Sequence, residues 1–127
     1  MNFRKLSLKS GKKVLAGKNA ESNEELVNQV KDNEIVLHTR KPGSPFVNIK
    51  SESKKMSKKD LKEAAIFCAK FSQAWKKPKI NPEFVEVDYF LGKNIVKIEG
   101  MKLGSFLVKK HKTIKVKREE IIKFLEK

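Results

Sequence analysis

The chain is poor in the residues that build disulfides, metal centres and membrane spans. Its 127 residues include a single cysteine, Cys68, and two histidines, His38 and His111. One thiol cannot form an intrachain disulfide, and three such ligands are too few for a zinc site unless carboxylates complete it. No apolar run approaches the roughly 18 residues of a membrane span, and no apolar stretch follows the basic N-terminus as in a secretory signal. We therefore expect a soluble, cytoplasmic protein without cofactor or metal.

Acidic residues are also scarce. Fifteen Asp and Glu face 30 Lys and Arg, which gives a formal net charge of +15. Residues 21–34 and 81–100 are net acidic, whereas every other segment is net basic. A polyanion would relieve the self-repulsion of such a chain and release its own condensed counterions, so nucleic acid is the expected partner. The alternative is a general lysine bias, but such a bias normally adds Glu along with Lys.

Hydrophobic residues are frequent enough for a folded core. They make up 39% of the sequence, and they are spread along it rather than confined to one part. A chain of this length forms one core and buries about two-thirds of its unfolded surface. We expect a single domain, residues 1–127.

Short apolar stretches separated by turn residues predict a fold rich in strands. Seven or eight strands are expected, at about residues 3–10, 13–16, 35–37, 46–49, 84–90, 95–98, 106–108 and 113–116. Most consecutive pairs are close enough to form hairpins, including 84–90 with 95–98 and 106–108 with 113–116. Antiparallel pairing is therefore expected for most of the sheet.

Three helices are predicted between these strands. The first covers Ser22–Val30 with a capping box of Ser22 and Glu25, the longest runs from Ser57 to Trp75, and the last covers Arg118–Lys127. The sequence thus indicates an α+β fold, in which a largely antiparallel sheet of short hairpin-linked strands is packed by one long central helix and two shorter helices.

The central helix carries a narrow apolar stripe. Ser57 and Asp60 form its predicted capping box, and apolar residues then recur at three- and four-residue spacing. Cys68 lies in the middle of this stripe, without a basic residue one turn away to lower its pKa. We expect Cys68 to be an inert core thiol rather than a nucleophile, and Trp75 to lie in the core as well.

The connection after the third predicted strand gathers hydrogen-bond donors. Arg40 can fork onto a phosphate, Lys41 adds a point charge, and Gly43 lets backbone N–H groups approach an anion. His38 can stack on a base or donate to a phosphate. The alternative is an ordinary Pro-Gly turn with solvated charges. The candidate contact residues of this loop are His38, Thr39, Arg40, Lys41, Gly43 and Ser44.

Three further basic segments are candidate contacts. Gly17-Lys18-Asn19 precedes a predicted helix, whose N-terminal N–H groups favour an anion, although the acids of that helix argue for a structural turn. Lys109-Lys110-His111-Lys112 forms the tip of a predicted hairpin, where solvated charge is the alternative. Together with the first hairpin, these segments are expected to widen the contact through Lys12, Lys13, Lys18, Asn19, Lys109 and Lys110.

Three motifs occur in an order and spacing typical of one protein family. They are Gly17-Lys18-Asn19 with Ser22-Asn23-Glu24 and Leu26, then His38-Thr39-Arg40 with Pro42-Gly43-Ser44 and Val47–Ile49, and finally Leu61-x-Glu63-Ala64-Ala65 with Phe71-Ser72-x-Ala74. Together they resemble the RNA-binding domain of NFACT proteins, NFACT-R, which is found in bacterial RqcH and eukaryotic NEMF. The similarity covers about residues 3–116.

This resemblance implies a non-catalytic, free-standing RNA-binding module linked to translation or ribosome quality control. The expected partner is structured RNA, either tRNA or rRNA, with the large ribosomal subunit as a further partner. The contact would be made through a basic face and the Pro-Gly loop.

Two other classes of function stay open at this point, as does the oligomeric state. The first is an RNA-processing or RNA-modifying enzyme with His38 as general base. No nucleophile elbow, Walker loop or carboxylate pair beside a histidine supports it. The second is a protein-interaction module whose basic face docks an acidic partner.

Overall fold

A six-stranded antiparallel sheet forms the centre of the described chain. A computed structural model describes residues 3–126. The strands lie in the order β1-β2-β4-β3-β5-β8, and every neighbouring pair is antiparallel. They are β1 (Arg4–Ser7), β2 (Lys13–Ala16), β3 (Glu34–Thr39), β4 (Val47–Glu52), β5 (Phe84–Leu91) and β8 (Lys112–Lys117). β6 (Ile95–Val96) and β7 (Leu107–Val108) form a separate two-stranded sheet. The predicted α+β class with a largely antiparallel sheet is confirmed.

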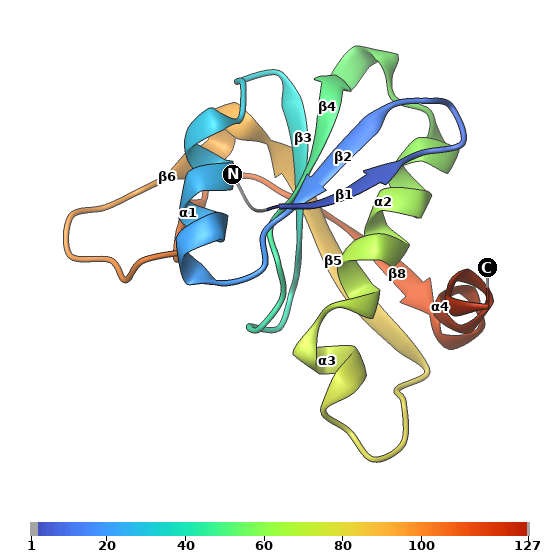
Figure 1. Ribbon diagram of the computed structural model, residues 1–127. Helices are drawn as coiled ribbons and strands as arrows, with labels where there is room; N and C mark the ends of the chain where they lie inside the picture. The colour runs from blue at the N-terminus through green and yellow to red at the C-terminus, as the bar shows by residue number, and fades with distance from the viewer. Residues whose placement is uncertain (1–2, 127) are drawn as a thin grey trace.

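Within residues 3–126 the helices are α1 (Ala20–Gln29), α2 (Lys58–Lys70), α3 (Gln73–Lys76) and α4 (Arg118–Leu125), with 3-10 turns η1 (Ser53–Lys55) and η2 (Gly92–Asn94). Figure 1 shows α2 and α4 on one side of the sheet, and α1 with β6 on the other. In β3, Ile35 and Leu37 pack into the core that contains α2, whereas Val36 packs into the core that contains α1. Both faces of the central strands are therefore covered. None of these helices is both long and apolar enough to cross a lipid bilayer.

The first helix begins earlier than its sequence pattern predicts. Asn19 is the N-cap: its side-chain oxygen accepts the N–H of Ser22 at 2.9 Å, and the Ser22 hydroxyl accepts the N–H of Asn19 at 3.0 Å. The expected capping box of Ser22 and Glu25 is wrong, because the same reciprocal pattern is made three residues upstream. Asn is as good an N-cap as Ser, so the pattern alone did not decide between them.

The long central helix is interrupted near its end. α2 starts at the predicted Ser57–Asp60 capping box, which is confirmed, but it ends at Lys70 rather than continuing to Trp75. The buried Ser72 hydroxyl donates to the carbonyl of Ala69 at 2.6 Å and accepts the N–H of Trp75 at 3.3 Å. Ser72 thereby caps α3, which starts as a new helix. Trp75 is buried, as predicted.

Two of the predicted hairpins are wrong. β6 pairs with β7 and not with β5, and β8 pairs with β5 and not with β7. The turn at η2 is instead attached to the turn between α1 and β3, because the N–H of Lys93 donates to the carbonyl of Asp32 at 3.1 Å. Lys109-Lys110-His111 therefore lies in a crossover between the two sheets, and Lys112 is the first residue of β8. The last helix starts at Arg118 as predicted, and its expected last residue, Lys127, lies outside the described residues.

Candidate nucleic-acid interface

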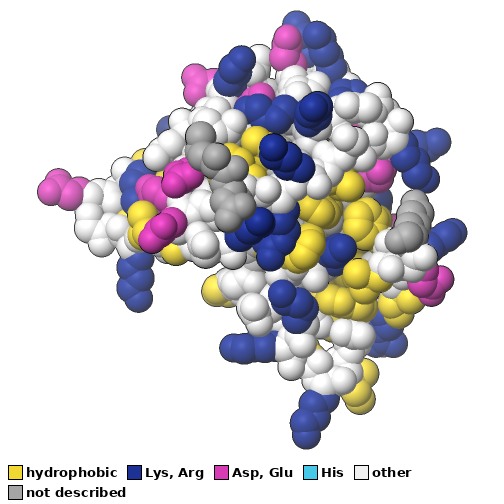
Figure 2. All heavy atoms as spheres, in the orientation of Figure 1, with side chains coloured by type: hydrophobic (Ala, Val, Ile, Leu, Met, Phe, Trp, Pro, Cys, Tyr) yellow, Lys and Arg dark blue, Asp and Glu magenta, His cyan; other side chains and the backbone are white. Residues whose placement is uncertain are grey.

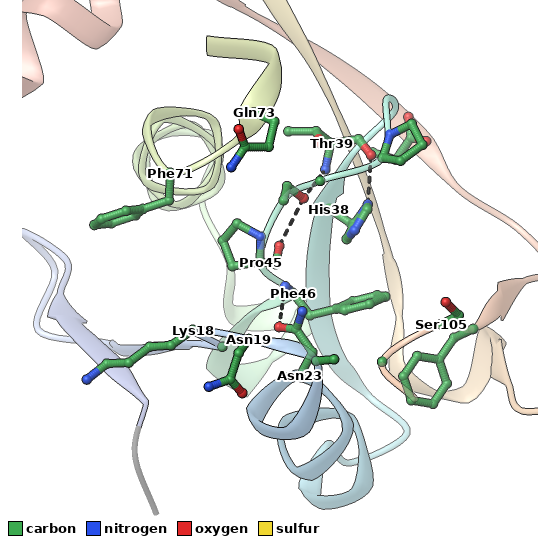
Figure 3. A pocket seen from close by; sticks show the side chains of 18 of the residues that line it. Lys18, Asn19, Asn23, His38, Thr39, Pro45, Phe46, Phe71, Gln73 and Ser105 are labelled. Carbon is green, nitrogen blue, oxygen red and sulfur yellow. Dashed lines mark hydrogen bonds between the residues drawn. The ribbon is translucent and has the colours of Figure 1, made fainter. Parts of the chain in front are cut away.

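Four segments that are distant in the sequence contribute most of the residues that line a hollow of about 590 Å³. They are the segment before α1, the β3–β4 loop, the start of α3 and the loop at residues 103–106. Figure 3 shows Gln73 of α3 on one side of Pro45 and Phe46, and Lys18 with Asn19 on the other. Seven of the predicted contact residues line this hollow, namely Lys18, Asn19, His38, Thr39, Arg40, Gly43 and Ser44.

The hydroxyl groups of the β3–β4 loop hold its shape. Thr39 is buried, and its hydroxyl donates to the carbonyl of Lys41 at 2.6 Å. The Ser44 hydroxyl accepts the N–H of Thr39 at 3.0 Å and donates to the carbonyl of Pro45 at 3.1 Å. Both side chains were predicted to contact a ligand, and both have partners within the loop. In the structure, the Thr39 and Ser44 side chains stabilise the conformation of the loop.

Gly43 lets this loop approach α3. Its φ of +91° lies in the region that favours glycine, and its carbonyl accepts the N–H of Gln73 at 2.8 Å. A Cβ at this position would come within 2.8 Å of the Cγ of Gln73. The close contact places the Gln73 side chain at the edge of the hollow.

The segment before α1 is attached to the same loop. The N–H of Gly17 donates to the carbonyl of Phe46 at 3.0 Å, and the side-chain oxygen of Asn23 accepts the N–H of Phe46 at 3.1 Å. Phe46 is thus bonded through both its backbone groups. Asn23, Phe46 and Gln73 were not among the predicted site residues. Asn23 lies in one of the three family motifs, which is the signal that could have indicated it.

His38 lies against the floor of the hollow in a neutral form. Its Nδ1 is 2.7 Å from the carbonyl of Thr39, so Nδ1 carries the proton and donates it. The ring centroid is 4.5 Å from that of Phe46. Burial lowers the pKa of His38, because desolvation disfavours the charged ring more than the Thr39 carbonyl and Asp88 favour it. Nε2 is therefore left as an acceptor.

Arg40 is surrounded by acids that sequence reasoning did not place beside it. Its guanidinium lies 3.8 Å from the Glu86 carboxylate and 3.7 Å from that of Asp88, both on β5. A third neighbour is His111, whose Nε2 is 3.4 Å from Nη2. These contacts follow from the β3–β5 pairing, which sets His38 opposite Asp88. The positive charge of Arg40 is partly compensated at the rim of the hollow.

Other cations line the hollow in addition to Lys18. Arg4 donates from Nη1 to the carbonyl of Gly17 at 2.8 Å, and its guanidinium lies 4.1 Å from the centre of the Phe71 ring. Lys76, at the end of α3, also lines it. Arg4 was not predicted as a contact, because on the sequence it belongs to an ordinary basic strand.

The remaining predicted cations lie outside the hollow. They are Lys12, Lys13, Lys41, Lys109 and Lys110. Lys12 instead forms an ion pair with the buried Asp60 at 3.0 Å, beside the start of α2. Figure 2 shows Lys and Arg side chains in several groups over the viewed face, with apolar and neutral surface between them.

Hydrogen bonds to Glu24 of α1 hold the loop at residues 103–106 against that helix. The same Glu24 carboxylate oxygen accepts the N–H of Gly104 at 2.7 Å and Nζ of Lys97 at 3.0 Å. The Gly104 hydrogen bond, helped by Lys97, lowers the pKa of Glu24 despite partial desolvation. Phe106 then meets Phe46 edge to face, with ring centroids 5.5 Å apart.

Three comparisons place this fold among known proteins. Residues 2–110 match the NFACT protein RNA binding domain. An archaeal Rqc2 homolog, aRqcH of Methanocaldococcus jannaschii, is 39% identical over 64 residues, which cover 50% of this chain and 10% of that protein. A structure of the C-terminal part of the fibronectin/fibrinogen-binding protein of Streptococcus suis has a TM-score of 0.82 at 25% identity. The match covers 97% of this chain and 49% of that one.

The match to the archaeal relative thus covers about a tenth of that protein, and the match to the streptococcal structure covers about half of it. The family match itself extends over most of the present chain. It includes the first two motifs, whose residues line the hollow, and the third motif, which lies in α2 and the start of α3. This chain belongs to the NFACT protein RNA binding domain family.

Proposed function

We propose that the chain binds structured RNA, either tRNA or rRNA, at the hollow, as a non-catalytic module of ribosome quality control in the cytoplasm. The family assignment supports RNA binding, and the Rqc2 homolog supports the ribosomal setting. The observation that carries the proposal is the meeting of Arg4, Lys18 and Lys76 at one concavity. These cations come from β1, from the segment before α1 and from α3. An anionic ligand that contacts all three would compensate their mutual repulsion. The large ribosomal subunit is the further partner proposed.

The cations around the hollow are suited to phosphate. Arg4 is held by Gly17 and by the Phe71 ring, so its remaining N–H donors are oriented before a ligand arrives. Lys18 and Lys76 add point charges that release counterions from RNA. Arg40 contributes after a phosphate displaces Glu86 and Asp88 from its guanidinium, which lowers its net gain.

The other predicted contacts keep a peripheral part in this proposal. Lys41 is exposed in the β3–β4 loop, outside the hollow, and Lys13, Lys109 and Lys110 are exposed on other segments. They extend the footprint through long-range attraction, which falls off within a Debye length of about 8–10 Å at physiological salt. Lys12 contributes least, because Asp60 already compensates its charge.

RNA-dependent measurements separate this role from catalysis. His38 is neutral and has an acceptor nitrogen, which is also what a general base needs. A binding module predicts that His38→Ala changes affinity and that neither protein cleaves or modifies the bound RNA. Turnover by the unmodified chain that is lost in His38→Ala would support the enzyme hypothesis instead.

The proposal is tested by titrating labelled tRNA and an rRNA fragment with the protein at several salt concentrations. Replacing Lys18 and Lys76 together by Ala removes two phosphate contacts. The slope of log Kobs against log salt concentration, which is negative, is expected to become shallower by about 1.4–1.8. The affinity is expected to fall for all RNA sequences.

The matched control replaces Lys93 and Lys123 by Ala. Both are exposed and neither lines the hollow, yet the change in net charge is the same. A smaller effect of the control pair is expected. Equal effects of the two pairs would mean that RNA senses only net charge, and failure of the unmodified chain to bind RNA at physiological salt would favour an acidic protein partner.

A further inference from the structure

The hollow is lined by amide side chains and an imidazole in addition to cations. We propose that it receives a single unpaired nucleotide of RNA, with the base inserted between α3 and the segment before α1 and the phosphate at the cationic rim. This inference rests on the proposed RNA binding and specifies which part of the RNA enters the site. It concerns nucleotides in loops or bulges, whose bases have left the helical stack.

The size and shape of the hollow suit one nucleotide. Its volume of about 590 Å³ falls within the roughly 300–1,000 Å³ of small-ligand sites. An A-form duplex hides the base edges of its deep, narrow major groove and displays the others in a wide, shallow minor groove. A concave site cannot surround a base edge in such a shallow groove, whereas an extruded base can enter it.

Three amide side chains present hydrogen-bonding groups toward this space. The side-chain oxygens of Asn19 and Asn23 accept the backbone N–H groups of Ser22 and Phe46, respectively. This fixes each amide so that its NH₂ group is the free end. Within residues 3–126 neither NH₂ group has a hydrogen-bond acceptor, and the exposed Gln73 side chain has no hydrogen bond at all. Asn and Gln are suited to base edges because one side chain offers both donor and acceptor.

His38 adds an acceptor of defined orientation. Because Nδ1 donates to the carbonyl of Thr39, Nε2 presents a lone pair. No described residue donates to Nε2. A base N–H or a ribose 2′-hydroxyl can fill that position, and the hydroxyl is the group that distinguishes RNA from DNA. The NH₂ donors of Asn19 and Asn23 and the Nε2 acceptor of His38 together suit a base edge that carries both hydrogen-bond acceptors and donors.

An apolar wall completes the site. Phe46 and Phe106 are in edge-to-face contact, and the His38 ring leans on Phe46. Base contact with aromatic side chains is tolerant of sequence and is worth about 1–3 kcal/mol per base. Phe46 is itself buried, so the half-buried Phe106 that packs against it is the ring that contacts the base. This contact supplies affinity for any base, and the amides supply preference among bases.

The test compares three RNA hairpins with the same stem. One is fully paired, one carries a single bulged nucleotide, and one carries an abasic residue at the bulge. The bulged hairpin is expected to bind about tenfold more tightly than the paired one. The abasic hairpin is expected to bind like the paired one, because it has the distorted backbone without the base.

The protein side of the test uses Gln73→Ala, an exposed residue whose side chain makes no hydrogen bond within the described chain. It is expected to weaken binding of the bulged hairpin severalfold and to leave the paired hairpin unchanged. The matched control is Asn28→Ala, which removes an exposed amide of α1 outside the hollow and keeps the preference for the bulge.

The outcomes separate this inference from the proposed function. Equal, measurable affinity for all three hairpins would overturn the nucleotide site and leave RNA binding intact. Equally tight binding of the abasic and bulged hairpins would also overturn it, because the base would then have no part. If the unmodified protein bound none of the three hairpins, both the nucleotide site and the proposed RNA binding would be overturned.

Discussion

The side-chain oxygen of Asn23 accepts the backbone N–H of Phe46 at 3.1 Å, and this bond joins α1 to the β3–β4 loop. Replacing Asn23 by Ala leaves the N–H of a buried residue without an acceptor, which costs about 1–3 kcal/mol of the free energy of unfolding. Urea denaturation measures this cost. Asn23→Asp keeps the acceptor oxygen and should retain most of the stability. Equal losses in the two variants would show that the hydrogen bond is unimportant.

Gly43 should be the least replaceable residue of the loop. Gly43→Ala imposes an unfavourable φ and brings a Cβ against Gln73, whereas Gly11→Ala imposes a similar φ of +94° with no atom within 4 Å of the new Cβ. We expect Gly11→Ala to cost about 1 kcal/mol of stability and Gly43→Ala to cost clearly more. RNA affinity should fall only in Gly43→Ala. Equal losses of stability in Gly43→Ala and Gly11→Ala would show that the contact of Gly43 with α3 is unimportant.

Glu24 should favour RNA binding even though it is acidic. Glu24→Ala releases the loop at residues 103–106, so RNA affinity is expected to fall severalfold and the Gly104 amide to exchange its hydrogen faster. Glu25→Ala is the matched control, because it removes the same charge from an exposed neighbour on α1. It should tighten RNA binding slightly. Tighter binding by both variants would mean that only charge matters at this position.

Stability should depend on pH through Asp60. Its burial favours the neutral acid, but hydrogen bonds from Ser10, Lys12 and the N–H of Ser57 outweigh this and lower its pKa to about 2. The folded-state pKa lies below the ordinary value of 3.8. The resulting stabilisation, of the order of 2 kcal/mol, is therefore complete above about pH 5 and disappears as the pH falls through about 4 to 2.

Asp60→Asn isolates this contribution. The difference in unfolding free energy between the two proteins should shrink as the pH falls from 5 to 2, because protonation makes Asp60 resemble the amide. A difference that is constant over this range would contradict the assignment.

Cys68 should report on opening of the core. Burial raises the pKa of its thiol to about 12, so the thiolate is scarce at neutral pH. The side chain projects from α2 and is fully buried, with its Sγ 3.7 Å from the carbonyl oxygen of Pro45 in the β3–β4 loop. Thiol reagents should react with the native protein only at the rate at which it opens, and rapidly in urea. Fast native labelling at pH 8 would contradict the inert role.

Local patterns predicted most elements, because caps and alternation act over a few residues. The Ser57–Asp60 box and the strands up to β5 belong to this group. The partners of β6, β7 and β8 were mispredicted, since short strands near turns fit hairpins whichever sheet they join. Ser72 was missed as a helix break because serine is also compatible with a continuing helix, and only its bonds to Ala69 and Trp75 decide the matter.

Local patterns likewise predicted part of the lining of the hollow, which is the candidate site. Lys18, Asn19 and His38 stood out by residue type and motif, and the structure brings them to one hollow. Arg4 and Gln73 look like ordinary strand and helix residues on the sequence, and Asn23 is distinguished only by its place in a family motif. The acids beside Arg40 depend on the register of β3 against β5, which no local pattern encodes.

The most direct test of RNA binding at the hollow is a map of backbone amide chemical-shift changes as tRNA or an rRNA fragment is added to the isotopically labelled chain. If RNA binds at the hollow, the largest changes are expected in four separate segments, residues 17–23, 38–46, 73–76 and 103–106. Changes confined to residues 9–13 and 54–59, or to residues 112–123, with these four segments unaffected, would contradict it.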